Sequence, residues 1–231
     1  MTTADPGDRF ARQRTLLADG QASLEQSSVL VIGCGGLGAG AIPPLVASGV
    51  GTVTLLDDDV VEASNLNRQT LFTTADLGGS KAELAAARMR ALNPGATVTA
   101  RRHRLTADDV ELVAGHDLVL DCTDRAASRS AISAACRVAG TPWIWAAIDG
   151  WTAVISVFTP GHTQYEDVVP NPTESPVPLQ ILGALPSMAG AWQAAEAVKV
   201  LTGQGRPLVD RLAVVDLLTA DVRFVDLARP S

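Results

Sequence analysis

Residues 29–38 read Val-Leu-Val-Ile-Gly-Cys-Gly-Gly-Leu-Gly, an apolar run that stops at a glycine-rich turn. An uninterrupted apolar run of this kind is typical of a parallel strand that is buried on both faces of a sheet. The turn carries the spacing G-x-G-x-x-G at Gly33, Gly35 and Gly38. Glycines at this spacing allow a tight turn and let phosphate groups approach the backbone at the start of a helix. The run therefore predicts a nucleotide-binding strand, turn and helix.

Strand and helix patterns alternate along the chain on the C-terminal side of this turn. The apolar runs that predict further strands are 53–56, 118–120, 143–148 and 153–158. The helical stretches between them are 81–92, 107–114 and 126–139. Because strands and helices alternate, we predict a doubly wound, Rossmann-like α/β sheet that is mostly parallel. Segments 212–218 and 222–227 predict a C-terminal antiparallel extension of that sheet.

The 231 residues are expected to form a single domain with four parts. These are an N-terminal helical arm at 1–28, a nucleotide-binding core at 29–159, a crossover loop at 160–186, and a closing helix and hairpin at 187–231. The crossover loop is rich in proline and small polar residues, which predicts a long exposed loop. Pro43 and Pro44 fall within the helix after the glycine turn. Since each proline removes a backbone donor, we expect that helix to be short or kinked.

Composition and charge exclude several classes of function. The net charge is −7, and the densest basic group, Arg101, Arg102 and Arg104, is more typical of a solvated strand face than of a nucleic-acid footprint. No apolar run reaches the ~18 residues that a membrane-spanning helix needs, and the N-terminus has no apolar signal core. We therefore expect a cytoplasmic protein with neither a nucleic-acid nor a membrane partner.

An acidic residue, Asp57, follows the second predicted strand, 19 residues after Gly38. A carboxylate at this place can bind the ribose hydroxyls of a nucleotide. The glycine turn and this carboxylate are most often found together in dinucleotide-binding proteins. By themselves the two features favour an NAD-dependent oxidoreductase.

Further motifs point instead to chemistry at the phosphates. They are Asp57-Asp58-Asp59, then Ser64-Asn65-Leu66-Asn67-Arg68-Gln69, then Lys81 at the start of a helix, and Asp121-Cys122-Thr123-Asp124 after a later strand. Hydride transfer needs no arginine and lysine beside the phosphates. Expulsion of pyrophosphate does, because negative charge builds on the bridging oxygen. A carboxylate of the last motif could hold Mg2+ against a triphosphate. Together these residues indicate that ATP is spent to activate a carboxylate.

Four ordered motifs resemble those of the ThiF/MoeB/HesA family, the bacterial relatives of ubiquitin-activating enzymes, over nearly the whole chain. They are Arg9 to Gln13, Ser64 to Gln69, Asp121 to Asp124 and Gln193 to Lys199. The family adenylates the C-terminal carboxylate of a small ubiquitin-like protein, which usually ends in Gly-Gly. The resemblance implies an adenylyltransferase that uses ATP and Mg2+, acts on a sulfur-carrier-like protein and works as a homodimer.

The resemblance also implies roles for the matching residues. The implied nucleotide contacts are Gly33, Gly35, Gly36, Gly38, Asp57, Asp59, Ser64, Asn65, Arg68, Gln69, Lys81 and Asp124. Asn65 and Arg68 would contact the phosphates and steady the transition state, and Lys81 would bind the triphosphate. Asp124 would carry Mg2+. Arg12 would reach across a dimer interface into the partner's ATP site.

The chain departs from the family pattern at its cysteines. Many relatives carry two C-x-x-C pairs that bind zinc, but this chain has three isolated cysteines, so we predict no zinc. The crossover loop has no cysteine for a thioester step. Cys34 and Cys136 are expected to be buried and inert, whereas Cys122 lies beside the site. We therefore expect the enzyme to stop at the acyl-adenylate and to hand it to another protein or a small nucleophile.

Other substrates and functions stay open on the sequence alone. Trp143, Trp145 and Trp151 are expected to crowd the groove for the substrate tail, which favours a peptide or small-molecule carboxylate as an alternative substrate. A nicotinamide oxidoreductase is less favoured, and so is a non-catalytic scaffold that binds nucleotide. Glu196 and Lys199 are three residues apart on a predicted helix, and we expect a structural ion pair there.

Overall fold

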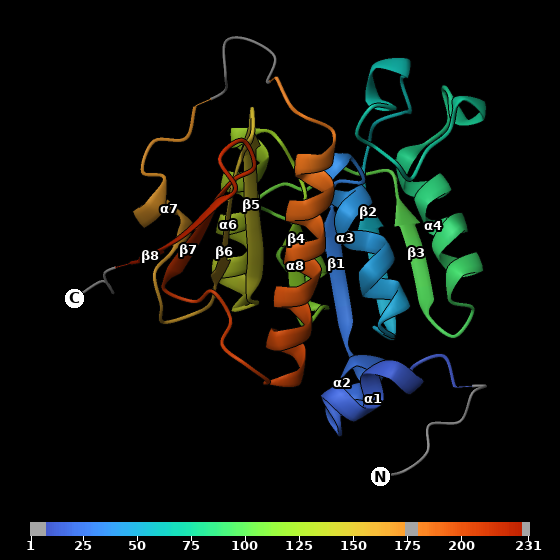
Figure 1. Ribbon diagram of the computed structural model, residues 1–231, viewed down its shortest axis with the longest axis horizontal. Helices are drawn as coiled ribbons and strands as arrows, with labels where there is room; N and C mark the ends of the chain where they lie inside the picture. Colours follow the sequence, from blue (N-terminus) through green and yellow to red (C-terminus); the bar gives the residue numbers. More distant parts are fainter. Residues whose placement is uncertain (1–7, 174–179, 228–231) are drawn as a thin grey trace.

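The computed structural model describes residues 8–173 and 180–227, and within these residues its centre is an eight-stranded sheet (Figure 1). The strands are β1 (Ser28–Ile32), β2 (Thr52–Leu56), β3 (Thr97–Arg101), β4 (Leu118–Asp121), β5 (Trp143–Asp149), β6 (Thr152–Phe158), β7 (Arg211–Asp216) and β8 (Asp221–Asp226). Their order across the sheet is β3-β2-β1-β4-β5-β6-β7-β8. The first five strands are parallel and the last three run antiparallel to their neighbours. The predicted mostly parallel sheet with an antiparallel extension is confirmed.

Helices cover both faces of this sheet (Figure 1). One face carries α3 (Gly36–Ala47), α4 (Lys81–Leu92) and α8 (Ala184–Thr202), and the other carries α5 (Val110–Ala114) and α6 (Ala126–Ala139). Two short helices, α1 (Ala11–Leu17) and α2 (Gly20–Gln26), lie beyond the amino ends of the parallel strands. The remaining helical turns are η1 (Ala63–Asn65), η2 (Thr74–Asp76) and α7 (Tyr165–Val168).

The order of the parallel strands decides where a ligand can bind. β1 lies between β2 and β4, so the strands that follow β1 in the chain are added first on one side and then on the other. In such sheets ligands bind outside the carboxyl ends of the strands, at the point where the order reverses. The glycine turn follows β1 and therefore lies at this point.

The helix after the glycine turn is longer than its two prolines predicted. α3 runs without a break for 12 residues and holds Pro43 and Pro44 in its interior. Pro44 is exposed and Pro43 half-buried, whereas Ile42, Leu45 and Val46 are fully buried. The buried side chains stabilise the helix by packing, and the prolines lie on its more solvent-exposed side. The expectation of a short helix was wrong, because packing outweighs the lost backbone donors, and the alternative of a kinked helix stays a prediction.

The segment predicted as a long exposed loop, 160–186, is partly ordered and buried. It contains α7, and Thr163 and Tyr165 are only 3% and 2% exposed. Residues 174–179 lie outside the described residues. The closing helix, predicted from residue 187, already begins at Ala184, because Pro186 is tolerated in a first helical turn. The predicted helix at 107–114 begins only at Val110, after a turn in which Asp109 accepts hydrogen bonds from Thr106.

Of the three tryptophans that were expected at the substrate groove, Trp143 and Trp145 lie in the core. Trp143 and Trp145 alternate with residues of the other face along β5 and pack against Phe158 and Tyr165, with ring centroids 4.9–6.2 Å apart. This cluster lies on the face covered by α5 and α6. The expectation that both rings crowd a substrate groove was therefore wrong, and only Trp151 is exposed.

Candidate active site

A pocket opens at the carboxyl ends of β1, β2 and β4. Its lining combines the glycine turn, the acidic end of β2, a cationic group and the turn after β4. The lining residues that the sequence predicted are Gly33, Gly35, Gly36, Asp57, Asp59, Arg68, Gln69, Lys81 and Asp124. Residues that lie far apart in the sequence therefore meet at one site, at the place expected for a doubly wound sheet.

The glycine turn is held close to the end of β4. Gly33 has a φ of 98°, and a Cβ there would lie 2.6 Å from the carbonyl oxygen of Cys122. Gly38 does not line the pocket, and a Cβ on it would overlap the carbonyl oxygen of Gly33. Gly35 and Gly36 thus face the ligand space, while Gly33 and Gly38 permit the close packing that shapes it.

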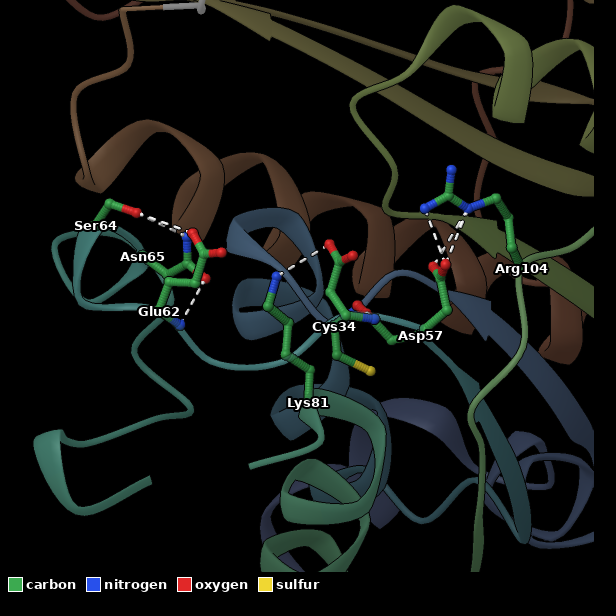
Figure 2. A network of polar contacts seen from close by, with 9 residues as sticks. Cys34, Asp57, Glu62, Ser64, Asn65, Lys81 and Arg104 are labelled. Carbon is green, nitrogen blue, oxygen red and sulfur yellow. Dashed lines mark hydrogen bonds and ion pairs between the residues drawn. The ribbon is translucent and has the colours of Figure 1, made fainter. Parts of the chain in front are cut away.

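Asp57 connects the end of β2 to the glycine turn. Its Oδ2 accepts a hydrogen bond from the backbone N–H of Cys34 at 2.7 Å, and its Oδ1 accepts one from Asp59 at 2.9 Å (Figure 2). Burial raises the pKa of this carboxyl, and the two hydrogen bonds oppose that shift. Each oxygen keeps a free lone pair, so the carboxylate can also accept bonds from ribose hydroxyls.

A nearly buried lysine supplies positive charge to the pocket. The side chain of Lys81 is 7% exposed, and its Nζ lies 3.3 Å from Oδ2 of Asp59. Figure 2 shows the side chain of Lys81 within the polar network that also includes Asp57. Lys81 is the first residue of α4, and its backbone N–H donates to the carbonyl of Asp59. Asp59, a predicted nucleotide contact, is therefore the counter-ion of Lys81 in this structure.

The turn around η1 carries Arg68, which lines the pocket, and also two further predicted nucleotide contacts, Ser64 and Asn65. Arg68 donates from Nη1 to the carbonyl of Ser64 and to Oδ1 of Asn67, both at 3.0 Å. Asn65 is buried and accepts a bond from the backbone of Glu62, as Figure 2 shows. Neither Ser64 nor Asn65 lines the pocket. These two residues stabilise the turn that carries Arg68.

Gln69, next to Arg68, has an unsatisfied polar atom at the pocket. The side chain is 5% exposed, and its Oε1 is buried without a hydrogen-bond partner among the described residues. Buried polar atoms are normally paired. Gln69 is therefore suited to accept a hydrogen bond from a ligand.

Oxygen ligands for a divalent cation are present at the pocket. Asp124 lines it, is exposed, and makes no side-chain hydrogen bond or ion pair with any described residue. Carboxylate oxygens of Asp57, Asp58 and Asp59 lie within 4.8 Å of one another, the one such acidic group in the described ranges. Mg2+ prefers oxygen ligands and is usually bound by one or two carboxylates together with phosphates. The residues therefore fit a magnesium ion.

The three cysteines are all buried and free. Burial raises the pKa of the Cys34 thiol and of the Cys122 thiol well above the ordinary value. The Sγ of Cys122 lies 3.6 Å from Oε1 of Gln193. Burial likewise raises the pKa of Cys136. Thiolates are the reactive form of cysteine, so these environments are those of inert thiols.

Arg12 is the one predicted catalytic residue that lies far from this pocket. It is exposed on α1, beyond the opposite end of the strands (Figure 1). It is not among the residues that line the pocket of its own chain.

Sequence reasoning missed several lining residues. Arg104 forms an ion pair with Asp58, with Nη2 2.9 Å from Oδ2, and Arg125 follows Asp124 at the rim. Only Arg101 of the basic group belongs to β3, so the expected strand face was wrong for Arg104. The segment after β3 ends at the same edge as the other parallel strands, and that rule could have found Arg104. Ile148 and Ile181 also line the pocket, and only tertiary packing brings them there.

The comparisons with known proteins show the family of this chain. The sequence matches the ThiF family over residues 10–231. It is 37% identical over 242 residues to the sulfur carrier protein adenylyltransferase of Thermus thermophilus, covering 98% of this chain and 89% of that protein. It is 39% identical over 232 residues to the sulfur carrier protein ThiS adenylyltransferase of Escherichia coli, covering 96% and 92%.

Solved structures share the fold at lower identity. MccB of E. coli with MccA-N7isoASN superposes with a TM-score of 0.88 at 23% identity, covering 98% of this chain and 73% of MccB. PaaA superposes with a TM-score of 0.83 at 22% identity, covering 99% and 86%.

A Rossmann-type sheet that brings a glycine turn together with Arg68 and Lys81 at one pocket is the arrangement of a nucleotide-binding protein. The chain belongs to the ThiF family, and its activity is that of an adenylyltransferase. Family membership sets aside the oxidoreductase interpretation. No described helix has the length and apolar character that crossing a membrane requires.

Proposed function

We propose that this enzyme uses ATP to adenylate the C-terminal carboxylate of a small ubiquitin-like sulfur-carrier protein that ends in Gly-Gly. The observation that carries the proposal is the meeting of Arg68 and Lys81 with the glycine turn in one pocket. Two cations on the phosphate side are suited to a reaction that expels pyrophosphate. Relatives of similar length are named as adenylyltransferases of such carriers.

The reaction is an in-line displacement at phosphorus. A carboxylate oxygen of the carrier tail attacks the α-phosphorus, and the bond from this phosphorus to the bridging oxygen of pyrophosphate breaks. The products are the acyl-adenylate and pyrophosphate. The backbone of the glycine turn cradles the phosphates, and Asp57 holds the ribose. Catalysis then depends on positioning and on stabilisation of developing charge.

The cationic side chains take up the charge of the leaving group. Lys81 exchanges its contact with Asp59 for the triphosphate, and Arg68 turns its guanidinium from the carbonyl of Ser64 toward the phosphates. Asn65 acts by holding the turn that carries Arg68. Mg2+, held by Asp124, would neutralise part of the charge on the phosphates. Arg12 would complete the site of a second subunit in a homodimer.

The enzyme is proposed to work without a thioester. Support comes from the three thiols, which are buried, carry raised pKa values and lie outside the crossover segment 160–186. The acyl-adenylate would then leave for an external nucleophile.

The test is ATP–pyrophosphate exchange with Mg2+ and purified Gly-Gly-ended carriers. We expect carrier-dependent exchange that falls by roughly 100- to 1,000-fold in Arg68→Ala, the loss typical of removing one stabilising donor. Arg137→Ala is the matched control, because Arg137 is exposed on α6 and lines another cavity. If peptides or small carboxylates support exchange and the carriers do not, the substrate would be a peptide or small-molecule carboxylate in place of the carrier. If none of the carboxylates tested supports exchange, the result would contradict the proposal.

A further inference from the structure

A buried polar cluster lies directly behind the turn that carries Asp124. Asp121, the last residue of β4, is fully buried on the face covered by α6. Arg129 comes from the first turns of α6, and its side chain is 15% exposed. Its Nε lies 3.9 Å from Oδ2 of Asp121. The two charges therefore face one another beneath the nucleotide pocket.

These two residues hold Thr123 by all of its polar groups. Oδ1 of Asp121 accepts hydrogen bonds from the backbone N–H of Thr123 at 2.9 Å and from its hydroxyl at 2.7 Å. Arg129 donates from Nη2 to the carbonyl of Thr123 at 3.1 Å. The orientation of the peptide that leads into Asp124 is thereby set from behind. The carboxylate of Asp124 has no such support among the residues that the structure describes.

Arg129 is itself oriented by the neighbouring strand. Its Nη2 lies 3.5 Å from the carbonyl oxygen of Ala146 on β5, and its guanidinium carbon lies 6.0 Å from the ring centroid of Trp145. Trp145 is the register partner of Asp121. Strand β4, strand β5 and helix α6 therefore converge on one guanidinium.

The cluster is poorly suited to a purely stabilising role. Four buried polar atoms in it have no hydrogen-bond partner among the described residues: Asp121 Oδ2, Arg129 Nε, Ser133 Oγ and Trp145 Nε1. Ser133 lies one helical turn after Arg129, on the same side of α6. A buried ion pair with unsatisfied atoms costs more free energy than a well-packed apolar group would. The place of this pair, directly beneath the pocket, is explained by a function at the turn that it supports.

We propose that Asp121 and Arg129 are positioning residues, which fix the turn of Thr123 so that Asp124 presents its carboxylate to a magnesium ion on the bound triphosphate. This inference rests on the proposed function, because it takes Asp124 as the magnesium ligand. Residues behind a metal ligand commonly orient it, and their loss weakens metal binding by 10- to 100-fold. Neither residue lines the pocket, so neither is expected to contact the nucleotide.

The test compares nucleotide binding with and without the metal by calorimetry. ATP is titrated with Mg2+ and with EDTA, and AMP is titrated separately, into wild type, Arg129→Met, Arg129→Lys and Arg137→Met. We expect Arg129→Met to bind AMP and metal-free ATP within about twofold of wild type. We expect it to lose roughly 10-fold in affinity for ATP with Mg2+. Arg129→Lys keeps the positive charge but loses the planar fork of donors. Its affinity for ATP with Mg2+ should therefore fall between those of wild type and Arg129→Met. Arg137→Met, on the same helix, should match wild type.

The outcomes separate the inference from the proposed function. Equal losses for AMP and for ATP with Mg2+ in folded Arg129→Met would show a merely structural role and overturn the inference. Unchanged binding would overturn it too. If Arg129→Met does not fold by circular dichroism, Arg129→Lys and Asp121→Asn carry the same comparison. Wild-type binding that gains nothing from Mg2+ also overturns it. Absence of pyrophosphate exchange, with magnesium-enhanced binding intact, would overturn only the proposed function.

Discussion

At the scale of single residues, the glycine turn lies so close to β4 that we expect a substitution of Gly33 to destabilise the protein. An alanine there would have to adopt a φ near 98° and would bring its Cβ to 2.6 Å from a backbone oxygen. Gly78 also has a positive φ, 81°, but nothing lies within 4 Å of where its Cβ would be. Gly78→Ala should therefore cost only the conformational strain, about 1–2 kcal/mol.

Gly33→Ala should cost more than Gly78→Ala in free energy of unfolding and should also weaken AMP binding. Chemical denaturation of both variants and calorimetry with AMP measure the two effects. Equal destabilisation by the two substitutions would show that β4 can move aside, and would contradict the close packing that we describe.

The residues of the site could be predicted from the sequence where strand ends decide their place. Asp57 and Asp124 were placed at this edge because carboxyl ends of parallel strands share it, whereas Lys81 was predicted as the first residue of a helix. Asn65, predicted to contact the phosphates, and Ser64, predicted to contact the nucleotide, lie in the turn of η1, and neither is among the residues that line the pocket. The ion pair of Arg104 and Asp58 depends on how the chain folds back after β3, which local sequence patterns do not specify.

At the scale of elements, α8 is tied to the segment before β7 by one buried carboxylate. Glu196 is 1% exposed and accepts bonds from Trp192 Nε1 at 3.0 Å, Lys199 Nζ at 2.6 Å and the backbone N–H of Leu208 at 3.0 Å. The predicted ion pair of Glu196 and Lys199 is thus confirmed. The sequence could not show that the same carboxylate also holds a backbone group from another segment.

Glu196→Ala should destabilise the protein, because it leaves three donors without their acceptor. Unsatisfied buried groups cost about 1–3 kcal/mol each, so we expect a loss of at least 2 kcal/mol in free energy of unfolding. Lys199→Met is the comparison, since it removes one of the three donors and leaves the bonds from Trp192 and Leu208 to the buried carboxylate in place, so its loss should be smaller. Urea denaturation compares the two. A larger loss in Lys199→Met would show that the ion pair, and not the buried acceptor, joins these elements.

The arrangement of the elements was predictable where the chain is periodic. The residues at which the elements begin and end were not predictable. Apolar runs identified the strands because they are buried on both faces, as the burial of β1 and β4 shows. The failure at Pro43 and Pro44 arose because the contacts of Ile42 and Leu45 stabilise a helix that local propensity disfavours. Burial of Tyr165 within the expected loop likewise depends on packing against Trp143 and Trp145, which lie on a distant strand.

At the scale of the whole molecule, Asp121 links the free energy of folding to pH. Burial raises the pKa of this carboxyl to about 6 from an ordinary value of 3.8, and the nearby Arg129 only partly opposes that shift. A group whose pKa is higher in the folded state stabilises the fold most below its unfolded pKa, and this contribution is lost as pH rises through the folded value. The contribution of Asp121 should therefore fall between pH 4 and pH 7.

Asp121→Asn removes this titration and keeps an oxygen that can accept the hydrogen bonds of Thr123. Relative to wild type, the variant should gain about 1–1.5 kcal/mol in free energy of unfolding between pH 5 and pH 7.5, because only wild type must bury an ionised carboxylate at the higher pH. Denaturation in EDTA at both pH values measures the difference, and comparison with wild type cancels the contributions of other carboxyls, such as Asp57, whose pKa burial also raises. A difference that does not change with pH, or that changes in the opposite sense, would mean that Arg129 keeps the carboxyl of Asp121 ionised throughout. The buried pair would then be a fixed ion pair, and the turn of Thr123 would be held equally firmly at every pH at which the protein folds.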